Sequence, residues 1–426
     1  MTPSERVAAI RGKIPSGGLF AEKEWRVAPE AFPLSPKHLD KLEKLGHVLH
    51  LFAKACNLLY RQSVRGKQPA WIADLLDRGK PPELVALSRA EGIAQELPAV
   101  IRPDLIVTEE GFGLFEVDTI PGGLGLTAWL GESYAALGDD VLGGPDGMRK
   151  GFASIFPEGD VVISEEAATY RPEFEFLVGP ERVKAAEGYR LSPERPVYRF
   201  FESFDWPNLP TIRESYDPDA QAGKLTPPIK PYLEEKLWLA LFWLRPLLPF
   251  WRRELGDKGV KMLKEIVPYT WLVDPTPLPV HGVLPGLDIQ NWGEMASFSQ
   301  KERDLVLKIS GFSPQAWGSR GVHVGSDLAA GEWQKRLDEA LAGFGEHPYI
   351  LQRFAKGTLL EHTYEDEKGE IVPMKGRARV CPYYFVTAGG GDYPTLGGAL
   401  VTFCPADKKL VHGMRDAILV PVRKSG

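Results

Sequence analysis

The stretch that decides the fold is RPDLIVTEEGFGLFEVDTIPGGLG, residues 102–125. Two apolar runs lie on either side of a glycine-containing turn, which predicts two β-strands joined as a hairpin. Side chains alternate across a strand, so Glu116 and Asp118 point to the same face. If the two runs pair, Asp104 on the first run lies beside them.

Three carboxylates on one patch repel one another unless a cation lies between them. Mg²⁺ takes oxygen ligands and commonly uses one or two carboxylates together with substrate phosphates. The stretch alone is equally compatible with a solvated hairpin that carries acidic side chains. Asp104, Glu116 and Asp118 are therefore candidate metal ligands.

The order of these residues also resembles a known motif. Arg-x-Asp is followed after a twelve-residue step by Glu, and then by x-Asp-Thr-x-Pro-Gly. This pattern resembles the metal-binding end of the ATP-grasp ligases, among them the D-alanine–D-alanine ligases and the glutathionylspermidine synthases. The resemblance implies that Asp104, Glu116 and Asp118 hold Mg²⁺ against the phosphates of ATP. It also implies that Arg102 contacts the transferring phosphate or the acyl phosphate. Asp118 stands where the family usually has Asn, which adds a negative charge.

Composition places the chain among ordinary soluble proteins, with 43% hydrophobic and 25% charged residues. A length of 426 residues is too great for one simple core and predicts two or three lobes. The net charge of −6 and the lack of a dense Lys/Arg stripe exclude a general nucleic-acid binder.

The cysteines Cys56, Cys381 and Cys404 form no CxxC pair. They favour a reducing compartment, the cytoplasm, over a disulfide scaffold or a structural zinc site. The N-terminus has no apolar run, so no signal peptide is expected. The most apolar segment, residues 237–251, is interrupted by an arginine and two prolines and is too short to span a membrane. A buried helix is expected there.

Apolar periodicity predicts a mixture of helices and strands, and the fold class we expect is α+β. Apolar residues recur at helical spacing over 36–63, and strands alternate with a helix over 160–205. Together with the family resemblance, this gives five segments: a helical N-terminal region (1–100), the acidic hairpin and following helix of an ATP-grasp core (101–140), a small α/β lobe on the substrate side (141–230), a helical connection (231–303) and an ATP-binding lobe with a glycine-rich lid (304–426).

A second group of candidates begins at Lys308, which lies inside the apolar run 304–309. An unpaired ammonium is costly to bury, so Lys308 must reach solvent or meet an anion. The loop that follows is rich in glycine, and its backbone N–H groups can donate to phosphates together with Ser319 and Arg320. An ordinary surface loop is the alternative.

A strand lysine followed by a glycine-rich lid resembles the ATP-grasp arrangement over the β- and γ-phosphates. Ser-Arg-Gly-Val at 319–322 is close to the pattern of the glutathionylspermidine synthase-like branch. The resemblance places Gln352 at the adenine, and Arg379 joins Arg102 as a catalytic candidate. The residues it implies for ATP binding are Lys258, Lys308, Ser319, Arg320, Gly321, Val322, Gln352 and Arg377.

The acidic motif precedes the lysine and the lid, whereas most ATP-grasp enzymes have the reverse order. This order resembles the circularly permuted branch. The resemblance to the ATP-grasp ligases implies an ATP- and Mg²⁺-dependent ligase that joins a small-molecule carboxylate to an amine through an acyl phosphate. No Ser/His/Asp elbow and no HExxH motif occurs. The alternatives are a non-catalytic nucleotide-binding or scaffold protein and a metal-dependent phosphohydrolase. Nucleic-acid and membrane partners are not expected, and the sequence indicates neither particular substrates nor an oligomeric state.

Overall fold

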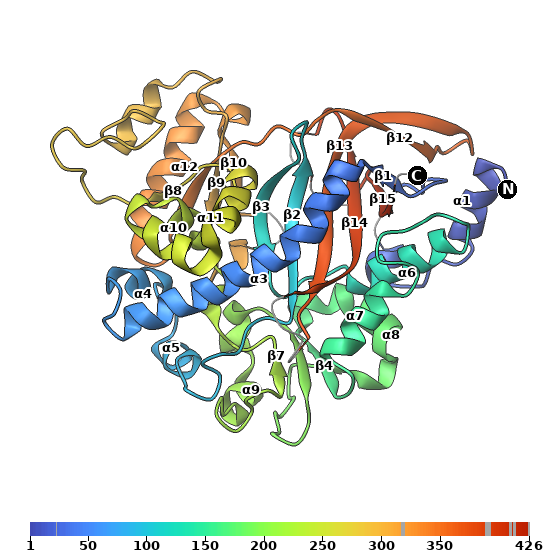
Figure 1. Ribbon diagram of the computed structural model, residues 1–426, viewed down its shortest axis with the longest axis horizontal. Helices are drawn as coiled ribbons and strands as arrows, with labels where there is room; N and C mark the ends of the chain where they lie inside the picture. Colours follow the sequence, from blue (N-terminus) through green and yellow to red (C-terminus); the bar gives the residue numbers. More distant parts are fainter. Residues whose placement is uncertain (23, 317–319, 388–392, 409–410, 412–414, 425–426) are drawn as a thin grey trace. The chain divides into compact units, whose positions relative to one another are not determined.

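The computed structural model (Figure 1) describes the chain except residues 23, 317–319, 388–392, 409–410, 412–414 and 425–426. Helices and strands are mixed along the chain, which divides into two compact units. The first unit contains Met1–Lys54, Ala90–Ile229 and Lys356–Gly426, and the second contains Ala55–Arg89 and Lys230–Ala355. Among the described residues, no helix is long and apolar enough to cross a membrane. The finer division into five segments stays a prediction.

The first unit is built on a seven-stranded sheet with the order β1-β15-β14-β13-β2-β3, and β12 pairs with β13. Its strand pairs are antiparallel except β1–β15. The hairpin expected from the acidic stretch is confirmed, since β2 and β3 pair as neighbours. The strands are β1 (Phe32–Leu34), β2 (Val100–Val107), β3 (Phe112–Asp118), β12 (Leu360–Glu365), β13 (Ile371–Phe385), β14 (Thr395–Pro405) and β15 (Ile418–Lys424).

Helices cover both faces of this sheet around the end of β13. Tyr384 packs against Gly46 of α3, whereas its neighbours Tyr383 and Phe385 meet the start of α6 and the helix α7. Since side chains alternate along a strand, α3 lies on one face and α6 and α7 on the other. The helices that begin in this unit are α1 (Pro3–Arg11), α2 (Gly18–Ala21), α3 (Pro36–Val64), α6 (Leu124–Ala135), α7 (Gly147–Ile155), α8 (Arg171–Val178) and α9 (Pro210–Ser215).

The strand–helix–strand pattern predicted over 160–205 is confirmed as a small parallel sheet of the first unit. Its strand order is β5-β4-β6-β7, and each neighbouring pair is parallel. The expected helix forms as a 3₁₀ turn, Glu165–Tyr170, followed by α8. The strands are β4 (Asp160–Ile163), β5 (Val183–Ala185), β6 (Val197–Phe200) and β7 (Leu225–Thr226).

The second unit contains an antiparallel four-stranded sheet with the order β10-β9-β11-β8. Trp271, Leu307 and Leu351 from this sheet pack with Trp333 and Leu337 of α12 in a buried apolar cluster. The strands are β8 (Thr270–Val273), β9 (Leu305–Ile309), β10 (Val322–Val324) and β11 (Tyr349–Arg353). The helices are α4 (Trp71–Leu76), α5 (Pro82–Ser88), α10 (Leu237–Trp243), α11 (Leu248–Ile266) and α12 (Ala330–Ala342).

One helix departs from its expected boundaries. A helix is expected over 81–96, but α5 ends at Ser88. Beyond it, the backbone of Gly92 lies against Asp219 and donates its N–H to Oδ1 over 2.7 Å, so this contact replaces a helical bond. The chain is also interrupted between the helices expected over 231–255 and 257–267, because Gly256 within α11 has φ +67°, a conformation that favours glycine.

We predict that Gly46→Ala destabilises the fold although alanine favours helices. A Cβ at position 46 would lie 2.5 Å from the Tyr384 ring, and overpacking of this kind costs about 1–3 kcal/mol. Gly331→Ala in α12 is the matched control, because its Cβ meets nothing within 4 Å and helix propensity predicts a gain of up to about 1 kcal/mol. Chemical denaturation measures both changes. Equal effects of the two substitutions would contradict the packing of α3 on β13.

Candidate functional site

Strand pairing brings the predicted metal-site residues to one face of the large sheet. In the β2–β3 ladder, Arg102 lies opposite Asp118, and Asp104 lies opposite Glu116. Residues opposite one another on antiparallel strands carry their side chains on the same face. The expectation that the three carboxylates lie beside one another on the hairpin is therefore confirmed at the level of strand register. Their role as metal ligands stays a prediction.

The guanidinium of Arg102 lies between two of these carboxylates. Its Nη2 is 3.2 Å from Oδ1 of Asp104 and 3.0 Å from Oδ2 of Asp118. Burial alone would lower the pKa of Arg102, but the charges of Asp104 and Asp118 raise this pKa well above its usual range. Burial raises the pKa of Asp118, and the charge of Arg102 opposes that shift. Arg102 is thus the internal counter-ion of the hairpin.

Asp104 is also held from the neighbouring strand β13. Nη1 of Arg379 donates to its Oδ2 over 3.1 Å, and the thiol of Cys381 donates to its Oδ1 over 3.3 Å. Arg379 donates further to the hydroxyl of Thr402 on β14 over 3.4 Å. Burial, with the charge of Asp104, raises the pKa of Cys381 to about 12. The thiol therefore stays protonated at neutral pH and is no nucleophile.

The donor set fits a hard cation, but the arrangement of the side chains does not provide a ready site. Carboxylate oxygens are the ligands that Mg²⁺ prefers. In the described ranges of the chain, no group of three His, Cys, Asp or Glu side chains is placed to hold a metal ion. At the hairpin, Arg102 occupies the space between Asp104 and Asp118. A cation bound by these carboxylates would therefore have to displace the guanidinium.

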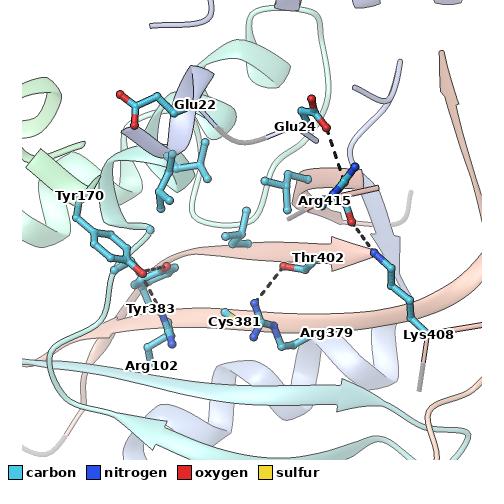
Figure 2. A pocket seen from close by; sticks show the side chains of 16 residues that line it. Glu22, Glu24, Arg102, Tyr170, Arg379, Cys381, Tyr383, Thr402, Lys408 and Arg415 are labelled. Carbon is cyan, nitrogen blue, oxygen red and sulfur yellow. Dashed lines mark hydrogen bonds and ion pairs between the residues drawn. The ribbon is translucent and has the colours of Figure 1, made fainter. Parts of the chain in front are cut away.

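Arg102 and Arg379 line a cavity of about 680 Å³ within the first unit. Figure 2 shows these arginines with Tyr383 and Thr402 on the strand side of the cavity, and Glu22 and Glu24 on the opposite side. The lining also includes apolar and cationic side chains, among them Leu19, Leu126, Leu400, Leu419, Lys408 and Arg415. A pocket with an apolar wall and several cations can hold a small organic anion.

The Gly122–Gly123 turn borders the cavity beside Arg102. The carbonyl oxygen of Gly122 accepts from Nη1 of Arg102 over 3.1 Å and from the hydroxyl of Tyr383 over 2.7 Å. Gly123 has φ +82°, which favours glycine. A Cβ on this residue would also lie 2.6 Å from the Tyr383 hydroxyl oxygen. The turn therefore brings the backbone within reach of Arg102, where a side chain would not fit.

Glu173 of α8 receives the backbone that follows this turn. Its side chain is buried, with 1% of the residue exposed. Its Oε1 accepts from the N–H of Gly123 over 3.3 Å, and its Oε2 accepts from the N–H of Leu126 over 2.8 Å. Burial raises the pKa of Glu173 to about 7, although the backbone N–H groups and the charge of Arg102 oppose the shift.

Lys308 and Gln352, predicted to bind ATP, meet in the sheet of the second unit. Both are buried, and Nζ of Lys308 donates to Oε1 of Gln352 over 2.8 Å. Nε2 of Gln352 donates to the hydroxyl of Thr270 over 3.0 Å. The adjacent strands β9, β11 and β8 thus carry a row of polar contacts. Contact of these side chains with a nucleotide stays a prediction.

The glycine-rich loop after β9 closes on itself at Gly321. The N–H of Gly321 donates to the carbonyl oxygen of Gln315 over 2.8 Å, and its own carbonyl oxygen accepts from the N–H of Ile309 over 3.1 Å. A Cβ at position 321 would lie 2.5 Å from the Ile309 side chain, so glycine is required there. Arg320 is exposed and Val322 begins β10. Ser319 lies outside the described residues.

The remaining candidates lie elsewhere. Lys258 is exposed on α11, two residues after the break at Gly256. Arg377 donates to the carbonyl oxygens of Gly357 over 3.2 Å and Ala406 over 2.8 Å. Of the two arginines of β13, only Arg379 is among the described residues that line the cavity. Arg377 holds backbone segments together.

Sequence reasoning did not identify Tyr383, Gly122 and Glu173 as parts of the site. Tyr383 follows Arg379 by four residues on the same strand, so period-two alternation could have placed it on the same face. Gly122 lies in the acidic stretch itself, but every residue has a backbone carbonyl, so the sequence does not indicate that this one accepts from Arg102. Glu173 lies 50 residues after Gly123 in the sequence, and only the packing of α8 against α6 brings it to the turn.

The chain matches no protein-family model and no curated protein sequence. Among solved structures it is similar to a glutathione synthetase-like effector from Globodera pallida in its apo form. The identity is 11%, the match covers 99% of this chain and 95% of that chain, and the TM-score is 0.53. It is also similar to a candidate gamma-glutamylcysteine synthetase from Methylobacillus flagellatus KT, at 10% identity, with 86% and 87% covered and a TM-score of 0.37. The first likeness shows a shared fold, and the second is too weak to support an argument.

We predict that Arg102→Gln destabilises the chain by about 3 kcal/mol, because it leaves Asp104 and Asp118 without their shared counter-ion. Added Mg²⁺ should restore part of the loss in this variant and stabilise it more than the wild type, since the carboxylates are then open to a cation. Denaturant unfolding with and without Mg²⁺ measures both effects. Arg377→Gln is the control, because Arg377 is bonded to backbone carbonyls and its loss should give no Mg²⁺ response. A variant at position 102 as stable as the wild type would contradict the ion-pair arrangement.

We also predict a pH dependence of stability that originates at Glu173. Its pKa is raised from 4.5 to about 7, so between these values the folded state binds a proton that the unfolded state has released. The contribution of Glu173 to stability is therefore greatest below pH 4.5, falls by roughly 3 kcal/mol as pH rises to about 7, and is constant above. Glu173→Gln should lack this decline. Denaturation of both proteins across that range measures the difference, and parallel pH profiles would contradict the assignment.

Proposed function

We propose that the chain is an ATP-dependent ligase that joins a small-molecule carboxylate to an amine through an acyl phosphate, with Mg²⁺ as its cation. The observation that carries the proposal is the meeting of Arg102 and Arg379 at Asp104 beside a cavity. Guanidinium groups bind carboxylates and phosphates through paired donors, so two of them at one cavity favour an anionic substrate.

The proposed reaction needs positioning and charge neutralisation more than covalent help from the protein. A carboxylate oxygen of the substrate attacks the γ-phosphorus and ADP leaves. The amine then attacks the acyl carbon, phosphate leaves, and the nitrogen loses a proton. Arg102 and Arg379 would hold the phosphoryl group and the acyl phosphate. Mg²⁺ bound by Asp104, Glu116 and Asp118 would neutralise the phosphate oxygens of ATP.

The nucleotide is assigned mainly to residues of the second unit. Lys308 now donates to the neutral amide of Gln352, and a phosphate oxygen would be a stronger acceptor for its ammonium group. The loop that closes at Gly321 would present backbone N–H groups to the phosphates. The proposed set is Lys258, Lys308, Ser319, Arg320, Gly321, Val322, Gln352 and Arg377.

The order of the two motifs along the chain favours the circularly permuted branch of ATP-grasp proteins, to which the glutathionylspermidine synthase-like proteins belong. The fold shared with a glutathione synthetase-like effector supports a synthetase-type reaction, since the name of that protein refers to a synthetase. A cytoplasmic ligase is consistent with the three unpaired cysteines.

A non-catalytic nucleotide-binding protein of the same descent is the second candidate. It is favoured by the position of Arg102 between Asp104 and Asp118, and by the description of the similar solved structure as an effector.

An assay with hydroxylamine distinguishes the candidate functions, because hydroxylamine reacts with an acyl phosphate to give a hydroxamate. A ligase forms hydroxamate and ADP only with a suitable carboxylate, a phosphohydrolase forms ADP without one, and a binding protein forms neither.

ATP with Mg²⁺ should bind the wild-type chain, and Asp104→Ala and Lys308→Ala should each weaken this binding by about tenfold or more. The first variant removes a cation ligand, and the second removes a phosphate contact. Isothermal titration calorimetry with and without Mg²⁺ measures the affinities. Lys335→Ala is the control, because it removes an exposed lysine of α12 in the same unit as Lys308. Absence of ATP binding to the folded wild type would exclude both the ligase and the nucleotide-binding protein.

A further inference from the structure

The contacts of Glu173 link a buried carboxylate to the cavity through the protein backbone. Its two oxygens accept from the N–H groups of Gly123 and Leu126, at the start of α6. The preceding residue, Gly122, presents its carbonyl oxygen to Nη1 of Arg102. The turn between them is therefore fixed on one side by Glu173 and fixes Arg102 on the other.

The turn has little room in which to move. A Cβ on Gly122 would overlap the ring of Tyr170, and a Cβ on Gly125 would overlap the backbone of Glu173. Because these groups are packed so closely, a shift of α8 would also move the Gly122–Gly123 turn. A displacement of the Gly122 carbonyl would move the acceptor on which one end of the Arg102 guanidinium rests.

Among the residues that the structure describes, three charged or titratable groups face Glu173 from the elements packed against it. They are Arg102 of β2, Tyr170 of the 3₁₀ turn and Tyr383 of β13. Burial and the charge of Glu173 raise the pKa of Tyr170 to about 12, and burial also raises the pKa of Tyr383. Both phenols are neutral at physiological pH, so Arg102 is the one cation in this group.

We propose that Glu173 is a positioning residue that sets the place of the Arg102 guanidinium in the cavity by holding the Gly122–Gly123 turn. The proposal rests on the proposed function in one respect, namely that Arg102 binds the anionic group of a substrate. A neutral side chain at position 173 offers one strong acceptor oxygen in place of two, so the turn loses a restraint. Anion affinity then falls although Arg102 itself is intact.

The two roles that Glu173 could have differ in sign. If it acted on the cavity only as a nearby negative charge, its removal would strengthen anion binding. If it positions Arg102, its removal weakens anion binding. The folding stability of Glu173→Gln distinguishes these two roles from a third, in which Glu173 only stabilises the fold. At a pH above its own pKa, Glu173→Gln removes a buried charge and leaves the fold at least as stable as the wild type.

Sulfate is the probe, because it remains a dianion across the pH range in which Glu173 titrates. Its affinity for the full chain is measured by isothermal titration at about pH 8 and about pH 6, and thermal unfolding is followed in parallel. The variants are Glu173→Gln, Arg102→Lys and the control Glu175→Gln. Glu175 lies on the same helix, is one-third exposed and pairs with Arg171, so it carries the same chemical change without contact to the turn.

We expect Glu173→Gln to bind sulfate about tenfold more weakly than the wild type at the higher pH, with no loss of thermal stability. Glu175→Gln should bind as the wild type does. Wild-type affinity should fall as the pH is lowered through about 7, and the affinity of Glu173→Gln should not. Equal or tighter binding by Glu173→Gln, with weaker binding by Arg102→Lys, would overturn the proposal and leave the proposed function intact. If Arg102→Lys binds sulfate as well as the wild type, or if the wild type binds none, the role of Arg102 in the proposed function fails, and the positioning role fails with it.

Discussion

The register of the β2–β3 ladder is the constraint on which the candidate site depends. It sets Arg102 opposite Asp118 and Asp104 opposite Glu116. A shift of one residue would turn every side chain of one strand to the other face and separate the charges. The adjacent strand β13 adds Arg379 to the same face, where it reaches Asp104. The site is therefore made of alternate residues on three neighbouring strands, and it needs no loop to assemble its charges.

At this face the guanidinium groups of Arg102 and Arg379 pair with the carboxylates of Asp104 and Asp118. Arginine suits this position because its planar fork reaches several acceptors, whereas an ammonium is a single point charge. Arg102 bridges Asp104 and Asp118 with one nitrogen and reaches Gly122 with another. On the proposed function, a bound cation takes over the carboxylates and makes the guanidinium available to an anion in the cavity. Cation and anion would then bind with positive coupling.

Sequence patterns predicted the local elements well and the long-range contacts only in part. The hairpin of the acidic stretch and the strand–helix–strand pattern over 160–205 both form as predicted. Periodicity succeeds there because each strand carries its own signal. The bond between Lys308 and Gln352 was missed, since it depends on which strands become neighbours in the sheet. The ion pairs of Arg102 with Asp104 and Asp118 were missed as well. The alternation of side chains along a strand predicts the face on which a side chain lies, but not the residue with which it pairs.

The contacts at the start of α6 explain why an anion in the cavity would have to be bound by cationic side chains. A helix N-terminus offers free N–H groups and a positive dipole end, and it commonly receives an anion. Here Glu173 already accepts from two of those N–H groups, so the protein supplies its own anion. An external anion in the cavity must then be bound by side-chain cations, among them Arg102 and Arg379. Arg379 is held by Thr402 and Asp104, and Arg102, which pairs with Asp104 and Asp118, also donates to the turn that Glu173 holds. Anion affinity is therefore set at the junction of α8 with α6, away from the atoms that would contact the substrate.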